Sequence, residues 1–399
     1  MDKSALYNIT YYFSGTMFAS SMASTVTKVR IVQELGNPIF IGLMYSFSTA
    51  IFLALDIGLS YIADTKSRRT MALFANICLG ACSLSLLYIT PSILFITFAL
   101  NGLGMAFLAG VPGAIVMEHT ERKERRLKLL SRMEVFCLAG SLIGNGLGIW
   151  IFMSHPEVVF VTSALLFFMV AAMTFHLLPT NRTTVNRARA RDKAILRDFY
   201  ATAKEIFSKK EVLIVFCIVL VLYLMSNVTA TYWIIYFSSA KTDMRTVDFA
   251  FIALSSSFVI VAKLISNLIS SYFPVHQFKF IVVVMALLFL LPSLYLQNNN
   301  LIFTIIIALS FLIERLFDSV VYVYFQNYLS DDRRATFSST FSTILAIIGI
   351  GPVLAVAPLM KTHLVVTLVG LSFASMALFI VLIFVVSASL ENASIIKDR

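Results

Sequence analysis

The chain is built from successive apolar blocks that are separated by short polar segments. A bilayer core about 30 Å thick is crossed by about 20 residues of helix, which is the size of these blocks. Lipid offers no partner to backbone polar groups, so only helices and closed barrels span it, and the blocks are too long and continuous for barrel strands. Only 13% of the residues are charged, which is low for a soluble domain. The sequence therefore predicts an all-α integral membrane protein.

Twelve blocks are long enough to cross the membrane, which puts both ends of the chain on one side. The predicted spans are residues 7–27, 38–63, 70–90, 93–117, 133–153, 158–178, 212–238, 248–272, 280–296, 301–325, 337–359 and 364–388.

Basic residues are distributed unequally across the predicted membrane. Of the 31 Lys and Arg residues, 24 fall in the chain ends and loops of one side, and Lys263 and Arg315 fall inside spans. The positive-inside rule makes that side, with both termini, cytoplasmic. The net charge of +10 thus reflects topology, with attraction to anionic lipids as a consequence, and it gives no support to a nucleic-acid partner. A bacterial plasma membrane is the expected location.

One polar segment, residues 179–211, is much longer than the others and carries nine basic residues. Apolar residues at Ile195, Phe199, Ala203 and Ile206 have helical spacing, which predicts an amphipathic helix on the cytoplasmic membrane surface. We therefore expect this segment to link an N-terminal six-helix bundle, 1–178, to a C-terminal one, 212–399.

The two predicted bundles resemble each other in sequence. Residues 120–146 and 329–352 each place an acidic residue and two arginines between one span and a glycine-containing span. Such repeats indicate a duplicated six-helix unit, and in transporters with parallel repeats the substrate site lies at the repeat interface.

The stretch LDIGLSYIADTKSRR (55–69) covers the end of the second span and the polar segment after it. It resembles the signature Gly-x-Leu-Ala-Asp-Arg-x-Gly-Arg-Arg of the major facilitator superfamily, with matches at Asp64, Arg68 and Arg69. The resemblance implies two six-helix bundles, transport by alternating access, and a cytoplasmic gate at these three residues. A role in membrane insertion alone is the alternative, and it accounts for the arginines better than for the aspartate.

Two departures from the family pattern concern the mechanism. Many proton-coupled members carry an Arg in helix 4, four residues before a Gly-x-Gly; here Phe98 precedes Gly102 and Gly104. The drug/proton antiporter branch often has Gly-Pro-x-x-Gly-Gly in helix 5. This chain has GSLIGNGLG (140–148), with Asn145 where proline is expected. The glycines allow close helix packing, but the antiporter signature is only half met, so the direction of transport is less defined than the fold.

Asp56 stands eight residues inward from Asp64, which is roughly 12 Å along a helix. A charged group near the bilayer centre costs about 2.5–3.5 kcal/mol or more and needs a reason to be there. Desolvation raises the pKa of a carboxyl toward neutrality, so Asp56 is a candidate for proton coupling or for binding a substrate cation. A structural hydrogen bond to a neighbouring helix is the alternative.

The densest charge cluster is LIERLFDS in the tenth span, with Glu314, Arg315 and Asp318. The two acids lie four residues apart on one helix face, and Lys263 in the eighth span is a possible partner. We predict transport roles for Glu314 and Asp318, with Arg315 and Lys263 as their charge partners. A fixed salt-bridge network between helices is the alternative. Glu134 is a further candidate, although a solvated carboxylate at a helix end explains it slightly better.

The first span carries a polar stripe of Ser14, Ser21, Thr25 and Lys28, spaced by seven, four and three residues. This spacing puts them on one helix face, which is suited to lining an aqueous cavity. Asn101 and Asn227 add hydrogen-bonding groups in spans that line the cavity in the family.

Motifs for ATP hydrolysis, nucleophilic catalysis and metal binding are absent from the sequence, and its four cysteines all fall in predicted spans. We therefore expect no enzyme activity and no cofactor. The predicted function is secondary active transport, with proton-coupled export of a small amphipathic or cationic compound by a monomer as the first choice. A proton-coupled uptake symporter remains open, as does a lipid-moving or non-transporting membrane protein.

Overall fold

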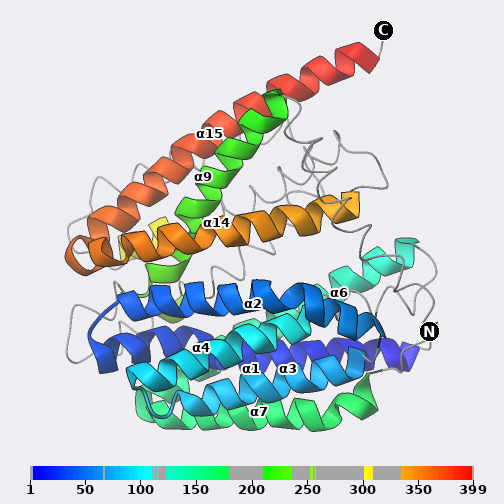
Figure 1. Ribbon diagram of the computed structural model, residues 1–399, viewed down its shortest axis with the longest axis vertical. Helices are drawn as coiled ribbons and strands as arrows, with labels where there is room; N and C mark the ends of the chain where they lie inside the picture. Colours follow the sequence, from blue (N-terminus) through cyan, green and yellow to red (C-terminus); the bar gives the residue numbers. More distant parts are fainter. Residues whose placement is uncertain are drawn as a thin grey trace. The chain divides into compact units, whose positions relative to one another are not determined.

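The computed structural model describes residues 3–65, 68–109, 111, 115, 123–178, 210–235, 252–254, 257, 301–308 and 334–397. Nine helices are delimited in this part of the chain (Figure 1), and each overlaps a predicted span. They are α1 (Lys3–Leu35), α2 (Ile39–Thr65), α3 (Arg68–Ser85), α4 (Pro91–Leu108), α6 (Lys123–Ser154), α7 (Pro156–Leu177), α9 (Lys210–Tyr232), α14 (Arg334–Thr362) and α15 (Leu364–Lys397).

Local sequence sets the helix ends. α1 ends before Gly36, which has φ of 62° and donates its N–H to the Val32 carbonyl at 2.9 Å, the left-handed cap that glycine adopts without strain. α4 begins after Thr90, whose hydroxyl accepts the Ile93 N–H at 3.3 Å.

α4 and α6 differ in length from the predicted spans. α4 ends at Leu108 rather than at 117, because Gly110 and Pro112 follow it and the Pro112 ring cannot pack beside the carbonyl of Leu108 in a continuing helix. α6 begins at Lys123, since the charged segment before the predicted span consists mainly of strong helix formers.

Six of the described helices are long and apolar enough to cross a membrane: α4, α7, and segments of α6, α9, α14 and α15. Their outer faces carry exposed apolar side chains, such as Trp150, which is 68% exposed, and Leu165 at 62%. Side chains of this kind are expected to face lipid.

The chain forms two compact units, Met1–Ala190 with Phe237–Ser257, and Arg191–Tyr236 with Phe258–Arg399. α1 to α7 belong to the first unit, and α9, α14 and α15 to the second. Residues 179–209, which hold most of the predicted linker and its amphipathic helix, lie outside the described residues. The division at 178 and 212 stays a prediction.

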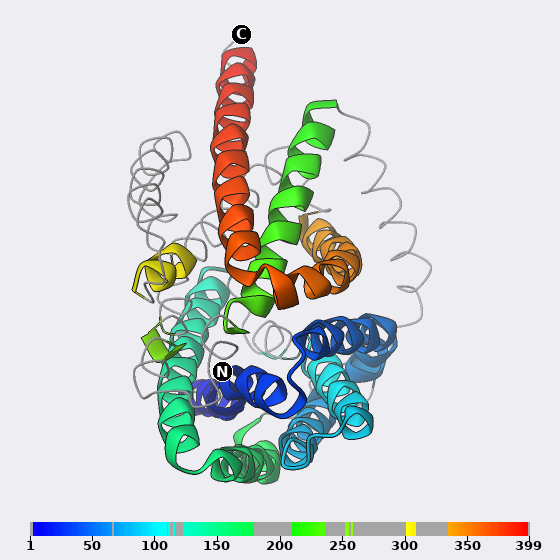
Figure 2. The same ribbon diagram turned by 90° about the vertical axis from the view of Figure 1, so that its left-hand side faces the viewer.

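Within the first unit, α1 packs against α6 on one flank and α7 on another. α3 contacts both α7 and α4, and α4 contacts α2 (Figures 1 and 2). α1 and α3 are therefore the helices through which the unit is connected.

The α1–α6 contact is made by three glycines of α6, four residues apart. A Cβ placed on Gly140 would lie 2.8 Å from the Ser14 carbonyl oxygen, and Cβ atoms on Gly144 and Gly148 would overlap the carbonyls of Phe18 and Met22. From one contact to the next, the residue numbers increase along both α1 and α6, so the two helices run parallel with their backbones in contact. Small residues at such positions are the usual means of close helix packing in lipid, as the sequence predicted for this segment.

A hydrogen-bond network joins α1, α3 and α7 on the far side of α1. The Tyr12 hydroxyl donates to the Ala72 carbonyl at 3.1 Å, lies 3.0 Å from the Thr174 hydroxyl, and accepts from the Asn76 amide at 2.7 Å. Thr16 donates to the Asn76 amide oxygen at 3.2 Å. All four polar side chains are buried, and each has a partner, as buried polar groups require.

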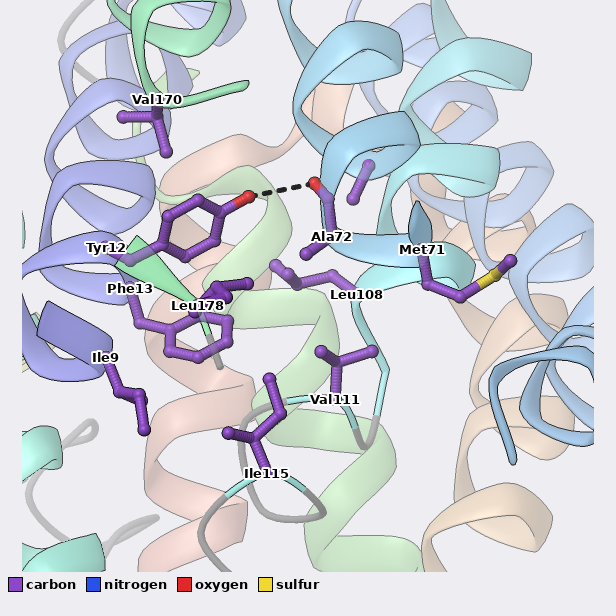
Figure 3. Packing of buried hydrophobic residues seen from close by; sticks show 11 residues of the cluster. Ile9, Tyr12, Phe13, Met71, Ala72, Leu108, Val111, Ile115, Val170 and Leu178 are labelled. Carbon is purple, nitrogen blue, oxygen red and sulfur yellow. Dashed lines mark hydrogen bonds between the residues drawn. The ribbon is translucent and has the colours of Figure 1, made fainter. Parts of the chain in front are cut away.

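Tyr12 is also part of a cluster of buried apolar side chains, and Figure 3 shows this cluster with the bond from the Tyr12 hydroxyl to the Ala72 carbonyl. The cluster includes Ile9, Tyr12, Phe13, Met71, Ala72, Leu108, Val111, Ile115, Val170 and Leu178. A second set of hydrogen bonds lies at Ala19, seven residues after Tyr12 on α1. The Ser163 hydroxyl of α7 donates to the Ala19 carbonyl at 2.8 Å and lies 3.2 Å from the Ser83 hydroxyl of α3. The three helices are thus bonded at two levels.

In the second unit α9 packs against α14 and α15. The buried Tyr232 hydroxyl donates to the Val353 carbonyl at 2.8 Å, which joins α9 to α14. Gly351 lies in the segment that resembles the glycines of α6 in sequence, but a Cβ placed on it would meet no atom of the described residues within 4 Å. In the described part of α14, this glycine therefore does not reproduce the close contact that α6 makes with α1.

Gly144→Ala should destabilise the first unit, because the added methyl group overlaps the α1 backbone. Overpacking of this kind costs about 1–3 kcal/mol. The unfolding temperature of the purified protein in detergent should fall. Gly146→Ala on the same helix is the matched control, because a Cβ there meets nothing within 4 Å in the described part of the chain. Equal effects of the two substitutions would contradict the described contact.

Tyr12→Phe should lower the free energy of unfolding by about 1–3 kcal/mol, because it removes the buried hydroxyl that bonds to Asn76, Thr174 and the Ala72 carbonyl. Tyr11→Phe is the control, since Tyr11 is 58% exposed. Chemical or thermal unfolding in detergent measures both, and a loss in the control as large as in Tyr12→Phe would argue against the network.

Candidate functional site

The polar stripe predicted on α1 divides into two parts. Ser14 donates its hydroxyl to the Phe136 carbonyl of α6 at 2.9 Å, so in this structure it joins the two helices. Ser21 and Thr25 are partly exposed, and their hydroxyls make no hydrogen bond to the residues the structure describes. Cavity lining by these three residues stays a prediction, which Ser21 and Thr25 fit better than Ser14.

Phe98 occupies the position where many proton-coupled relatives carry an arginine. Its side chain is 1% exposed, and its ring meets that of Phe95 at 6.3 Å, which in turn meets Phe47 of α2 edge-on at 5.6 Å. Ser48 donates to the Phe98 carbonyl at 3.0 Å, and a Cβ on Gly102 would lie 2.5 Å from the Ser48 carbonyl. This tightly packed, apolar α2–α4 contact is suited to phenylalanine and not to a charge.

Asn101 lies on α4 three residues after Phe98 and is partly exposed. Its amide has no hydrogen-bond partner in the described ranges, so it is available to a ligand. The role in binding that the sequence predicts for it is untested.

Asn145 on α6 is the most unusual polar residue of the first unit. Its side chain is 3% exposed, yet neither its amide nitrogen nor its amide oxygen has a hydrogen-bond partner among the described residues. Asn76, also buried, has every polar atom bonded. An unpartnered buried amide carries a free-energy penalty of about 1–3 kcal/mol, so Asn145 needs an explanation that packing of the described helices does not supply.

On α9 of the second unit, Asn227 is partly buried, and its amide nitrogen is enclosed without a partner in the part of the chain that the structure describes. The backbone carbonyl of Asn227 accepts a hydrogen bond from the Thr231 hydroxyl at 2.7 Å. The structure therefore places an available amide donor on α9, and a transport role for Asn227 stays a prediction.

The charged candidates fall mainly outside the described residues. Lys263, Glu314, Arg315 and Asp318 lie there entirely. For Asp56 and Asp64 the structure describes the backbone, which belongs to α2, but not the side chain. Glu134 is partly buried on α6. Proton coupling at these positions remains a prediction.

Arg68 and Arg69 form the first turn of α3, four and five residues after Asp64. Both are partly buried, and the Arg69 Nε is enclosed without a hydrogen-bond partner among the residues described. The Arg69 Nε–H can donate a hydrogen bond to a carboxylate that approaches when the helices move, which is what the predicted gate requires.

Sequence reasoning missed the Tyr12–Asn76–Thr174 network and the isolation of Asn145. Asn76 and Thr174 stand 64 and 162 residues from Tyr12, and their sequence context resembles that of any polar residue in a span. The structure groups no three His, Cys, Asp or Glu side chains into a metal site within the described ranges.

The sequence profile of the Major Facilitator Superfamily matches residues 8–352. The chain belongs to this superfamily, which confirms the resemblance seen at Asp64, Arg68 and Arg69. No curated protein sequence matches the chain. The protein is therefore a multi-pass membrane transporter of a small molecule and not an enzyme.

Solved structures of the same fold extend over nearly the whole chain. The nucleoside transporter NupG has a TM-score of 0.72 at 14% identity, with 97% of this chain and 99% of that chain covered. A D-xylose-proton symporter has 0.64 at 14%, covering 96% of each chain. A bacterial homologue of the human lysosomal transporter Spinster, inward-facing and unoccupied, has 0.68 at 12%, covering 100% and 99%. At these identities the likeness defines the fold alone.

Phe98→Arg should reduce the amount of folded protein recovered from membranes, because it buries an unpaired charge at a cost of at least about 2.5–3.5 kcal/mol. Phe98→Leu, which keeps the site apolar, should be recovered near the wild-type level. Size-exclusion profiles of the two variants after detergent extraction measure this. Normal recovery of Phe98→Arg would show that residue 98 can reach water or an acidic partner.

Proposed function

We propose that this protein is a secondary active transporter that works by alternating access and is driven by the proton gradient. The observation that carries the alternating-access mechanism is the bonding of α1, α3, α6 and α7 into one unit through backbone contacts and buried hydrogen bonds. Alternating access is largely a rocking of rigid bundles about a fixed site, and a unit bonded in this way is suited to move without internal rearrangement.

Proton coupling is assigned to Asp56, with the acids Glu314 and Asp318 as further carriers. Asp56 belongs to the α2 helix and stands eight residues before Asp64, too far from the cytoplasmic end to be part of the gate. A carboxyl group inside a membrane bundle is commonly a member of a proton relay or a ligand-binding residue. Asp64, Arg68 and Arg69 form the cytoplasmic gate in this proposal, in a bacterial plasma membrane with both termini inside.

Export of a small amphipathic or cationic compound is the first candidate for the direction. It is supported by α6, the fifth predicted span, which has closely packed glycines at Gly140, Gly144 and Gly148 as the antiporter signature has, although it lacks the proline. Uptake by proton symport is the second candidate. It is favoured by Asn145 in place of the proline of the antiporter signature and by the D-xylose-proton symporter among the structures of the same fold.

A transport screen in cells with and without the protein tests these candidates. The panel comprises ethidium, tetraphenylphosphonium, chloramphenicol, uridine and D-xylose. Lower cellular accumulation that a protonophore abolishes supports export, and higher accumulation that it abolishes supports uptake. Export and uptake are both contradicted if accumulation of no compound changes, which favours a lipid-moving or non-transporting protein.

Asp56→Asn should abolish uphill transport, because the amide cannot carry a proton through the cycle. The variant should insert normally, bind substrate and equilibrate it to the external concentration without exceeding it. Glu157→Gln is the matched control, since Glu157 is an exposed carboxylate in the first turn of α7 and should transport as the wild type does. Concentrative transport by Asp56→Asn in proteoliposomes with an imposed pH gradient would disprove the coupling role.

A further inference from the structure

The unpartnered amide of Asn145 has a definite place relative to α1. Asn145 follows Gly144, and each residue of a helix is rotated by about 100° from the one before it. Ser21 comes one residue before Met22, which contacts α6 at Gly148. When two parallel right-handed helices are in contact, the residue after a contact residue of one helix and the residue before a contact residue of the other lie on the same side of the pair.

Asn145 and Ser21 therefore lie on one side of the α1–α6 pair, and Thr25 follows Ser21 by one turn on that side. Ala19 comes one residue after the contact residue Phe18, so it lies on the opposite side, where α7 bonds to it through Ser163. The α1–α6 contact thus separates the helices that are hydrogen-bonded to α1 from Asn145, Ser21 and Thr25.

The groups on this side are chemically similar. Each is uncharged: one amide with both a donor and an acceptor, and two hydroxyls that can act as either. The Asn145 amide is enclosed without a partner among the described residues, and the Ser21 and Thr25 hydroxyls make no hydrogen bond within the described part of the chain. The glycine contact holds α1 and α6 in a fixed register, so these groups cannot find partners by sliding along one another.

A ligand that donates and accepts hydrogen bonds would satisfy all three. Asn145 falls near the middle of its predicted span, 133–153, at the depth where transporters of this architecture hold substrate. A buried amide that finds its partner in the substrate gives a site selectivity, because substrates that cannot bond to it leave it buried and unsatisfied.

We propose that Asn145 binds an uncharged hydrogen-bonding group, a hydroxyl or an amide, of the transported substrate, and that Ser21 and Thr25 bind further polar groups of the same molecule. The proposal rests on the proposed transport function and narrows its substrate class to compounds that carry such a neutral group. Asn145 is the principal binding residue, and the two hydroxyls are secondary ones.

Ligand-induced thermal stabilisation of the purified full-length protein in detergent tests the proposal without any gradient. The probes are uridine, D-xylose and chloramphenicol, which carry neutral hydroxyl or amide groups, and tetraphenylphosphonium, which has none. At least one of the first three should raise the unfolding temperature of the wild type. Stabilisation by tetraphenylphosphonium alone, or by no probe, would overturn the proposed substrate class.

Asn145→Leu should weaken binding of the stabilising compound by about tenfold or more, because the substrate's polar group loses its partner. The unfolding temperature of the ligand-free variant should stay equal or rise, since the unsatisfied amide is gone. A residue with a merely structural role would give the reverse, a lower unfolding temperature and unchanged binding, and that result would overturn the proposal.

Two further variants complete the test. Ser21→Ala removes only a partly exposed hydroxyl and should weaken binding of the same compound in a folded protein, so it replaces Asn145→Leu if that variant does not fold. Ser24→Ala on α1 is the matched control, because the exposed Ser24 hydroxyl already donates to the Ser21 carbonyl at 3.4 Å and so needs no partner from a ligand. Its binding should equal that of the wild type, and a loss as large as in Ser21→Ala would overturn the assignment.

The outcome for this site is separable from the outcome for the proposed function. If Asn145→Leu loses binding and transport by the wild-type protein is unaffected by a protonophore, the binding site is supported and proton coupling is refuted. Protonophore-sensitive transport with unchanged binding in Asn145→Leu would do the opposite.

Discussion

The close contact between α1 and α6 is the constraint on which the first unit depends. Because Gly140, Gly144 and Gly148 present no side chain, the α6 backbone lies directly against the α1 carbonyls. Lipid provides little hydrophobic driving force between helices, so such packing and interhelical hydrogen bonds must hold them together. The contact leaves one side of α1 for the bonded α3 and α7 helices and the other side for polar groups that have no partner among the described residues.

This division gives the polar residues of the unit two separate roles. Tyr12, Asn76 and Thr174 satisfy one another and fix three helices, which makes them part of the scaffold. Asn145 is equally enclosed but has no partner in the described part of the chain, which makes it a candidate for ligand binding. The same contrast explains why a buried amide by itself does not indicate function: only the state of its hydrogen bonds separates the two cases.

The sequence allowed the fold class, the superfamily and the glycine packing of helix 5 to be predicted, because apolar block length, the Asp64–Arg69 signature and four-residue glycine spacing are local features. The end of α4 at Leu108 was missed, although Gly110 and Pro112 signal it. The Tyr12 network could not be found, since its members come from helices far apart in sequence. Asn145 was visible as a replacement for proline, but its lack of partners depends on the packing of whole helices. Asp56, Glu314 and Asp318 remain predictions.

The central claim is that α1 and α6 move as one body while the protein alternates between its two states. Paired spin labels at Tyr11 of α1 and Val135 of α6, both exposed, measure this by electron–electron dipolar spectroscopy in a variant with the four native cysteines replaced. The account predicts one distance distribution that is unchanged by pH or by a bound substrate, while a Tyr11–Leu359 pair, one label in each unit, shifts under the same conditions. A Tyr11–Val135 distance that changes with the state of the protein would contradict it.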